Sequence, residues 1–145
     1  MDIDYYAPVR ARHEIIVNAP AATLWRLLTE IDSWPQWNPA IARSKLNGPI
    51  QEGTSFAWKS GGVSLVSTLQ DVVPEHRISW TGKALGLHAV HTWSLRPTTT
   101  GVAVETSESF AGWLASLLPG MLQKTLDKTL QNWLRNLKQA AEGSV

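Results

Sequence analysis

The chain has 145 residues, a formal net charge of +1 and no cysteine. One domain of this length buries a sizeable core, so we interpret residues 1–145 as a single domain. The missing cysteine excludes disulfides and thiolate chemistry, and the near-neutral charge argues against a nucleic-acid binder, which usually carries a basic patch. The acidic start, and the lack of an apolar run long enough to span a bilayer, predict a cytoplasmic protein without stable membrane insertion.

Tryptophan is unusually common, with eight residues against two phenylalanines. Each indole adds a large apolar surface and one N–H that needs a partner, so the composition predicts wide aromatic walls inside the protein. Two of the eight, Trp34 and Trp37, flank Pro35 in a segment whose prolines forbid a long helix.

The first elements are predicted to be a strand and a short helix. Residues 9–17, with the sequence VRARHEIIV, partly alternate and contain β-branched residues, as strands do. Pro20 suits the first turn of a helix, where its missing N–H costs nothing, and residues 20–31 carry apolar side chains at helical spacing. Ser33, Pro35 and Pro39 then end the helical segment.

Residues 41–110 are predicted to form consecutive strands, separated by turns rich in glycine and proline. Short strands with tight connections favour an antiparallel meander over strand–helix–strand units. The expected strands are residues 40–46, 54–59, 63–73, 77–81, 87–95 and 102–110.

The last part of the chain changes to a helical period, which predicts a helix of about six turns from Pro119 to a stop near Gly143. Its apolar stripe must lie on the sheet, the large apolar partner that the sequence provides. The stripe consists of Leu118, Leu122, Leu126, Leu130, Trp133, Leu137 and Ala140. The opposite side, predicted to face solvent, carries Lys124, Asp127, Gln131, Arg135 and Lys138.

This order of elements resembles the helix-grip superfamily of START lipid-transfer domains, Bet v 1 allergens and polyketide cyclase/dehydrase-like proteins, together called SRPBCC proteins. The small bacterial polyketide-cyclase-like members are the most similar. The first of three matching segments is the most specific, because it joins an alanine-proline helix start to a Trp-x-x-Trp-Asn-Pro loop. The segments are VNAPAATLWRLLTEIDSWPQWNPAI, HTWSLRPTTTGVAVETSESFAGWLASLL and LDKTLQNWLRNLKQAAE.

The resemblance implies an α+β helix-grip fold, in which a curved antiparallel sheet of about seven strands wraps around the long C-terminal helix. Two short helices are expected after the first strand. It also implies an apolar cavity between sheet and helix that binds a lipid, sterol, polyketide or aromatic molecule, with no cofactor. Since one fold hosts many activities, three functions stay open: ligand carriage, a polyketide cyclase or aromatase acting in the same cavity, and a co-chaperone-like interaction module. The sequence leaves the oligomeric state open.

Two titratable residues are predicted to face the interior on neighbouring strands. Alternation places His91 and Trp93 on the apolar face of one strand and Glu108 on that of the next, where a carboxylate is costly unless paired. A loop of residues 98–101 puts His91 opposite Glu108, whereas a loop of residues 97–100 puts it opposite Thr106 with Glu108 on the diagonal. The pair is a candidate ligand anchor, a candidate catalytic acid and base, or a structural hydrogen bond.

Further site residues are expected along the implied cavity. Trp37 matches the family's loop signature and is expected to be the more buried ring, bracing the short helices against the sheet, with Trp34 nearer the rim. His88 and His91 point to opposite faces of their strand, so no metal site is predicted. The candidate ligand-binding residues are Trp37, Phe56, Trp58, His91, Trp93, Glu108, Leu122, Leu126, Thr129 and Trp133.

Overall fold

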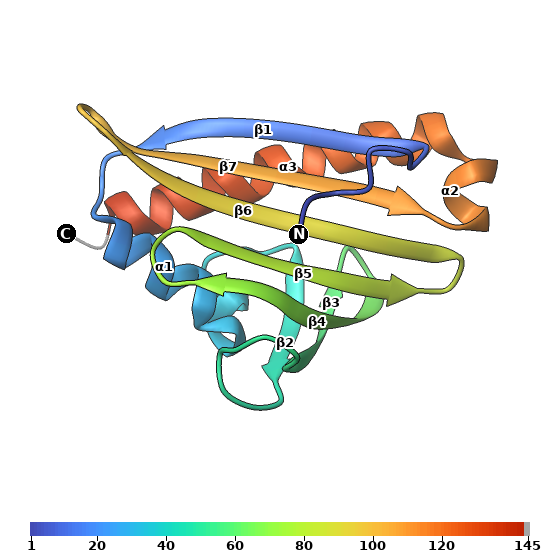
Figure 1. Cartoon of the computed structure of the whole chain (residues 1–145), viewed down its shortest axis with the longest axis horizontal. Helices are drawn as coiled ribbons and strands as arrows, with labels where there is room; N and C mark the ends of the chain where they lie inside the picture. The colour runs from blue at the N-terminus through green and yellow to red at the C-terminus, as the bar shows by residue number, and fades with distance from the viewer. Residues whose placement is uncertain (144–145) are drawn as a thin grey trace.

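The computed structural model describes residues 1–143 and confirms the α+β helix-grip fold (Figure 1). One antiparallel sheet has the strand order β1-β7-β6-β5-β4-β3-β2, so β2 to β7 form the predicted meander and β1 pairs with β7. Two short helices follow the first strand, as expected. The elements are β1 (Val9–Val17), α1 (Ala21–Thr29), the 3-10 helix η1 (Ile31–Gln36), β2 (Ile41–Leu46), β3 (Ser55–Ser60), β4 (Val63–Val73), β5 (Arg77–Ala84), β6 (Leu87–Thr98), β7 (Gly101–Ala111), α2 (Trp113–Leu117) and α3 (Pro119–Glu142).

The β6–β7 hairpin sets the register of the candidate site. Thr98 pairs with Gly101, so the turn is shorter than the four-residue loops considered from the sequence. This pairing places His91 opposite Glu108, which is one of the two predicted registers. Gly101 has φ +146°, and a Cβ there would lie 2.5 Å from the carbonyl oxygen of Val17. The tight turn therefore requires glycine beside the end of β1.

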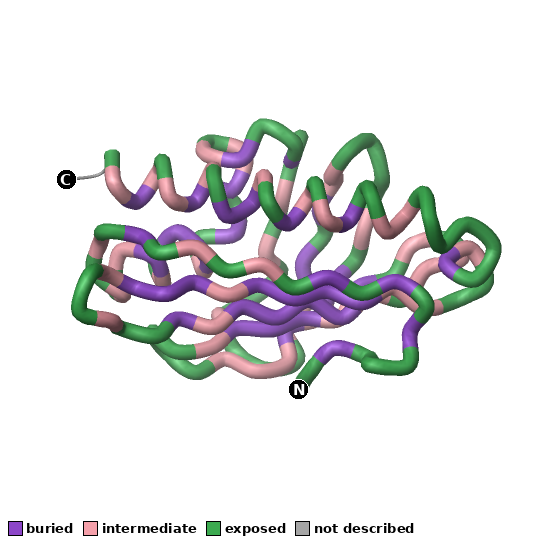
Figure 2. The backbone as a smooth tube through the Cα atoms, turned by 90° about the horizontal axis from the view of Figure 1, so that it is seen from above, coloured by how far each residue is buried: buried purple, intermediate pink, exposed green. Residues whose placement is uncertain are grey.

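α3 lies along one face of the sheet, and the N-terminal segment lies on the other (Figure 2). On that second face the backbone N–H of Asp4 donates to the hydroxyl of Ser109. The predicted apolar stripe of α3 is correct except at its start, where Leu118 is 38% exposed, because it precedes α3 at the junction with α2. The buried residues of α3 are Leu126, Leu130, Trp133, Leu134, Leu137 and Ala141.

The polar side of α3 is more than a solvated face, which corrects the expectation from the sequence. Nε2 of His13 on β1 lies 2.9 Å from a carboxylate oxygen of Asp127. Nζ of Lys138 donates to a backbone carbonyl of β1 at 2.8 Å, and the side chain of Gln123 bonds both backbone groups of Arg10. Since β1 is an edge strand, its outer backbone groups need partners, and α3 supplies several of them.

Candidate functional site

Aromatic rings fill much of the space between the sheet and α3. The ring centroid of Trp34 lies 5.2 to 5.4 Å from those of four neighbours, namely Phe56, Trp58, Trp80 and Trp133. Most of these contacts are edge to face, a geometry in which aromatic pairs attract each other. None of the five residues is more than 7% exposed. His91 and Trp93 pack against these five residues. We call all seven the aromatic layer: Trp34, Phe56, Trp58, Trp80, His91, Trp93 and Trp133.

The aromatic layer occupies the region that the resemblance assigns to a ligand cavity. A hollow of about 70 Å³ remains beside it, lined by Trp133 and Thr129 of α3 and by residues next to β2 and β3. This volume suits roughly two water molecules, whereas pockets for drug-sized ligands measure about 300–1,000 Å³. A ligand of the implied class therefore requires at least one ring to move.

The expected order of burial in the tryptophan loop is wrong, because Trp34 is fully buried and Trp37 only half-buried. The three-residue period of η1 places Trp34 on the same side as Ile31, which is also buried. Nε1 of Trp34 donates to the carbonyl of Leu28 at 3.2 Å, so its N–H is satisfied inside the core. Trp37 follows η1 and contacts Trp133, with ring centroids 5.6 Å apart.

The candidate pair belongs to a short chain of polar groups inside this layer. Nε2 of His91 lies 2.8 Å from the hydroxyl oxygen of Thr106, and that hydroxyl donates its hydrogen to the backbone carbonyl of Thr92 at 3.1 Å. Because a hydroxyl has one hydrogen, Thr106 must accept from His91, so Nε2 carries the imidazole proton. Nδ1 is then a lone-pair acceptor, and it lies 3.6 Å from a carboxyl oxygen of Glu108.

Burial decides the charge of the pair. It raises the pKa of Glu108 to about 8 and lowers the pKa of His91 to about 3, because the charged form of each group loses its hydration. Both groups are therefore neutral at pH 7, and the carboxylic acid of Glu108 has a proton to donate. The 3.6 Å separation is too long for a hydrogen bond, and Nδ1 of His91 has no other partner. Nε1 of Trp93 is likewise buried and unpaired.

Of the other predicted ligand-binding residues, Trp93, Glu108 and Trp133 lie next to His91 in the structure. Sequence reasoning missed Trp34, the central ring, and Thr106 as the partner of His91, although one considered register had placed Thr106 opposite His91. Phe56, Trp58, His91, Trp93 and Trp133 belong to the aromatic layer, Glu108 and Leu126 are buried, and Trp37, Leu122 and Thr129 are half-buried.

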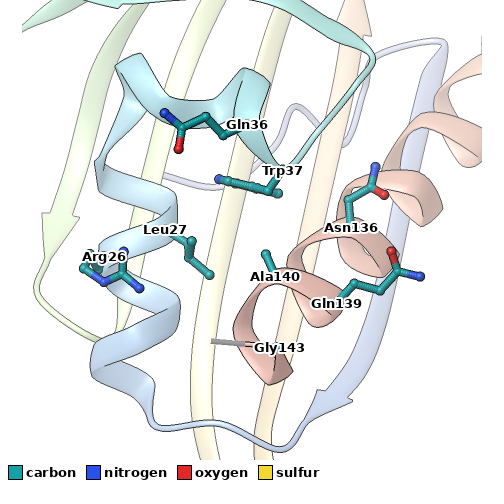
Figure 3. Close-up of a pocket in the computed structure, with 8 residues that line it drawn as sticks. All are labelled: Arg26, Leu27, Gln36, Trp37, Asn136, Gln139, Ala140 and Gly143. Atoms are coloured by element: carbon teal, nitrogen blue, oxygen red, sulfur yellow. The ribbon is translucent and has the colours of Figure 1, made fainter. Parts of the chain in front are cut away.

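A wider groove of about 550 Å³ lies outside the layer, between α1, η1 and the C-terminal part of α3 (Figure 3). Figure 3 shows Trp37 and Leu27 on one side and Ala140 on α3 across from them. Nε1 of Trp37 is buried without a hydrogen-bond partner, so this wall contains an unused donor. The remaining lining residues are Arg26, Gln36, Asn136, Gln139 and Gly143.

Within residues 1–143, no three His, Asp or Glu residues lie close enough together to hold a metal ion. In the same part of the chain, no helix combines the length and apolarity needed to cross a membrane.

Residues 8–142 match the model of a protein family described as polyketide cyclase / dehydrase and lipid transport. The chain belongs to this family. The match includes every strand of the sheet and the whole of α3. A search of curated proteins found no significant match.

Solved structures share the fold of this polyketide cyclase/dehydrase family member. Hypothetical protein jhp0584 from Helicobacter pylori is 18% identical with a TM-score of 0.85, over 96% of this chain and 91% of that chain. A START superfamily protein from Mycobacterium smegmatis is 18% identical with a TM-score of 0.79, over 94% and 99%. The di-domain ARO/CYC protein StfQ from the steffimycin biosynthetic pathway is 19% identical with a TM-score of 0.79, over 94% and 51%. Family and fold together indicate a ligand-binding domain of the START/polyketide cyclase type.

Proposed function

We propose that this domain binds or carries a small hydrophobic molecule with an oxygen function, of the lipid, sterol, polyketide or aromatic class, between the sheet and α3. Unused polar groups inside an apolar layer carry this proposal. Nδ1 of His91 and Nε1 of Trp93 are buried without partners, and the neutral carboxyl group of Glu108 lies beside the histidine. Leaving buried polar atoms unpaired is costly, so a ligand oxygen that bonds them gains affinity.

The chemistry of these groups selects the ligand. Nδ1 of His91 accepts a hydrogen bond, whereas the N–H of Trp93 and the protonated carboxyl of Glu108 donate one. A hydroxyl both donates and accepts, so a phenol, an enol or a sterol alcohol fits better than a hydrocarbon. The surrounding rings favour a flat aromatic body.

Trp133 controls access in this proposal. Its ring contacts Trp37 on the groove side and His91 on the inner side, with centroids 5.6 and 6.0 Å away. In this proposal the ring of Trp133 moves aside when a ligand passes from the groove to the polar group. The groove, at about 550 Å³, has the volume for the body of such a ligand.

The test compares naphthol with naphthalene, which share an aromatic body and differ by one hydroxyl. We expect naphthol to bind about fivefold to tenfold more tightly in a calorimetric or fluorescence titration, since a net hydrogen bond contributes about 1–1.4 kcal/mol. Bound naphthol should also shift the side-chain ¹⁵N resonances of His91. Equal affinity for the two probes, or no shift at His91, contradicts the proposal.

A matched pair of variants locates the site. Trp93→Phe keeps a ring and removes the unpaired N–H, so it should reduce the preference for naphthol. Trp113→Phe changes an indole that is 61% exposed and outside the aromatic layer, and it should leave the preference unchanged. Native mass spectrometry of freshly purified protein then identifies any co-purified apolar molecule.

The fixed tautomer of His91 favours a second candidate function, a cyclase or dehydratase type of proton transfer. Glu108 would donate a proton to a leaving ligand oxygen and then take one back from a ligand carbon, while Nδ1 of His91 accepts a hydrogen bond from the ligand. In that case Glu108→Gln abolishes turnover of a poly-β-ketone probe and leaves its binding largely intact. A carrier shows no turnover with either protein.

A further inference from the structure

The β5–β6 turn, α2 and the start of α3 lie at one end of the molecule (Figure 1), and each of them has large exposed apolar side chains. Leu85, in the turn between β5 and β6, is 86% exposed. Trp113 and Leu117 are 61% and 67% exposed, and their spacing of four residues places them on one side of α2. Met121, in the first turn of α3, is 58% exposed. We call these four side chains, with the partly exposed Leu118, the apolar tip.

Backbone contacts hold the apolar tip in a defined shape. The backbone N–H of Leu114 donates to the carbonyl of Gly86 at 3.0 Å, which ties α2 to the β5–β6 turn. Gly86 has φ +75°, and a Cβ there would lie 2.7 Å from the ring of Trp113. The indole therefore packs against the turn at Gly86, next to Leu85, while 61% of the Trp113 surface stays exposed.

Exposed lysines flank the tip, and the exposed Asp4 lies farther along β7, beside Ser109. Residues 76–104 and 109–126, which include the whole tip, contain no aspartate or glutamate. Of the two glutamates between these stretches, Glu108 is buried, and Glu105 is partly exposed and forms an ion pair with Arg12. Lys83, two residues before Leu85, and Lys124, one helical turn after Met121, are both exposed. The tip is thus apolar at its centre and cationic at its flanks.

We infer that the apolar tip docks this domain on the surface of an anionic lipid bilayer. A membrane interface accepts protruding leucine and methionine side chains, favours tryptophan at the headgroup level, and attracts flanking lysines when its lipids are anionic. A stable protein interface instead takes about 20–30 residues on each side, and the apolar tip has five side chains. The inference is independent of which ligand the aromatic layer holds.

Vesicle co-sedimentation of the purified full chain tests this inference. We expect the protein to bind vesicles of phosphatidylcholine with phosphatidylglycerol more tightly than phosphatidylcholine alone, and to bind less at high salt because the lysine contribution is screened. A Trp113→Ser, Leu117→Ser double variant should lose about tenfold or more in affinity for the anionic vesicles. A Lys83→Glu, Lys124→Glu double variant should lose the preference for the anionic lipid.

Matched controls lie away from the tip. Ile16→Ser changes an exposed apolar residue near the opposite end of β1, and Lys45→Glu reverses an exposed charge on β2; both should bind vesicles like the wild type. All of these positions are on the surface, so each variant should fold, and a thermal melt of each variant checks this. The inference is overturned if the wild type ignores anionic vesicles or if the Trp113/Leu117 variant binds them equally well. It is also overturned if sedimentation velocity shows a dimer that this variant abolishes, since the tip is then a contact between two copies.

Discussion

The hydroxyl of Thr106 lies 2.8 Å from Nε2 of His91 and donates its own hydrogen to the backbone of Thr92, so it fixes the histidine as the Nε2–H tautomer. Thr106→Val keeps the shape of the side chain and removes this acceptor. We expect a loss of about 1–3 kcal/mol in the free energy of unfolding, because a buried N–H is left unpaired. Long-range ¹H–¹⁵N correlation spectra should show the His91 tautomer redistributed in this variant.

Thr106→Ser is the matched control for that prediction. It restores the hydroxyl in a slightly smaller side chain and should recover the wild-type tautomer. A Thr106→Val spectrum identical to that of the wild type would show that another group fixes the histidine.

Burial of Glu108 and His91 predicts an unusual dependence of stability on pH. Glu108 binds its proton up to about pH 8 in the folded state but only up to 4.5 when unfolded, so it makes stability fall as pH rises through this window. The pKa of His91 falls from 6.5 to about 3 on folding, so His91 makes stability fall as pH drops through that window. The two effects oppose each other between pH 4.5 and 6.5.

Between pH 6.5 and about 8 the effect of Glu108 acts alone, and the free energy of unfolding should decrease by up to about 1.4 kcal/mol per pH unit. Urea denaturation across this range measures the slope. Glu108→Gln cannot ionise, so the difference between the two proteins isolates the contribution of this carboxyl. Parallel slopes for wild type and variant would mean that Glu108 is already ionised in the folded protein.

The two tryptophans of the η1 region should differ in their contributions to stability. Trp34 is completely buried among four rings and its N–H is bonded, so Trp34→Ala should lower the free energy of unfolding by about 3–5 kcal/mol. Trp37 is half-buried at the groove, so Trp37→Ala should cost under about 2 kcal/mol. Chemical denaturation of the two variants gives the comparison directly. A larger loss for Trp37 would reverse the order of burial described above.

The contact between His13 and Asp127 predicts a small acid-sensitive contribution to stability. The hydrogen bond from His13 lowers the pKa of Asp127 below its ordinary value of 3.8. The contact therefore contributes to stability above pH 3.8, and this contribution is lost as the pH falls through the lowered pKa. Because the Asp127 side chain is 43% exposed, Asp127→Asn should cost less than about 1 kcal/mol at pH 7. Urea denaturation at pH 7 and below pH 3.8 measures the stability difference between the wild type and Asp127→Asn at each pH. Lys124→Gln, on the exposed side of the same helix, keeps this contact, so its stability difference from the wild type should be the same at both pH values.

Sequence periodicity was sufficient for the elements, and it left two registers open for the candidate pair. Alternation on two strands placed His91 and Glu108 inward, and the short loop limited their alignment to two choices, one of which is observed. Periodicity did not predict that Thr106, rather than Glu108, bonds the imidazole. That choice depends on side-chain rotamers and on which hydroxyl has its hydrogen engaged elsewhere.

The direction of Trp34 in the tryptophan loop could not be predicted from the sequence. The prolines correctly indicated that no long helix passes through it, but the direction of Trp34 depends on a 3-10 turn whose period differs from that of an α-helix. The polar side of α3 is a similar case. Asp127 lies opposite the apolar stripe in sequence and yet reaches β1, because α3 runs beside the open edge of the sheet.

By itself the sequence determined the order of elements and the inward position of His91 and Glu108, because these follow from side-chain spacing along single strands and helices, and its resemblance to a known superfamily implied the helix-grip architecture. Only the tertiary structure decided that indoles from η1, β3, β5, β6 and α3 meet in one layer and leave about 70 Å³ beside it. Whether rings from distant segments fill a space or line it depends on how their volumes pack in three dimensions, and spacing along the chain does not encode this.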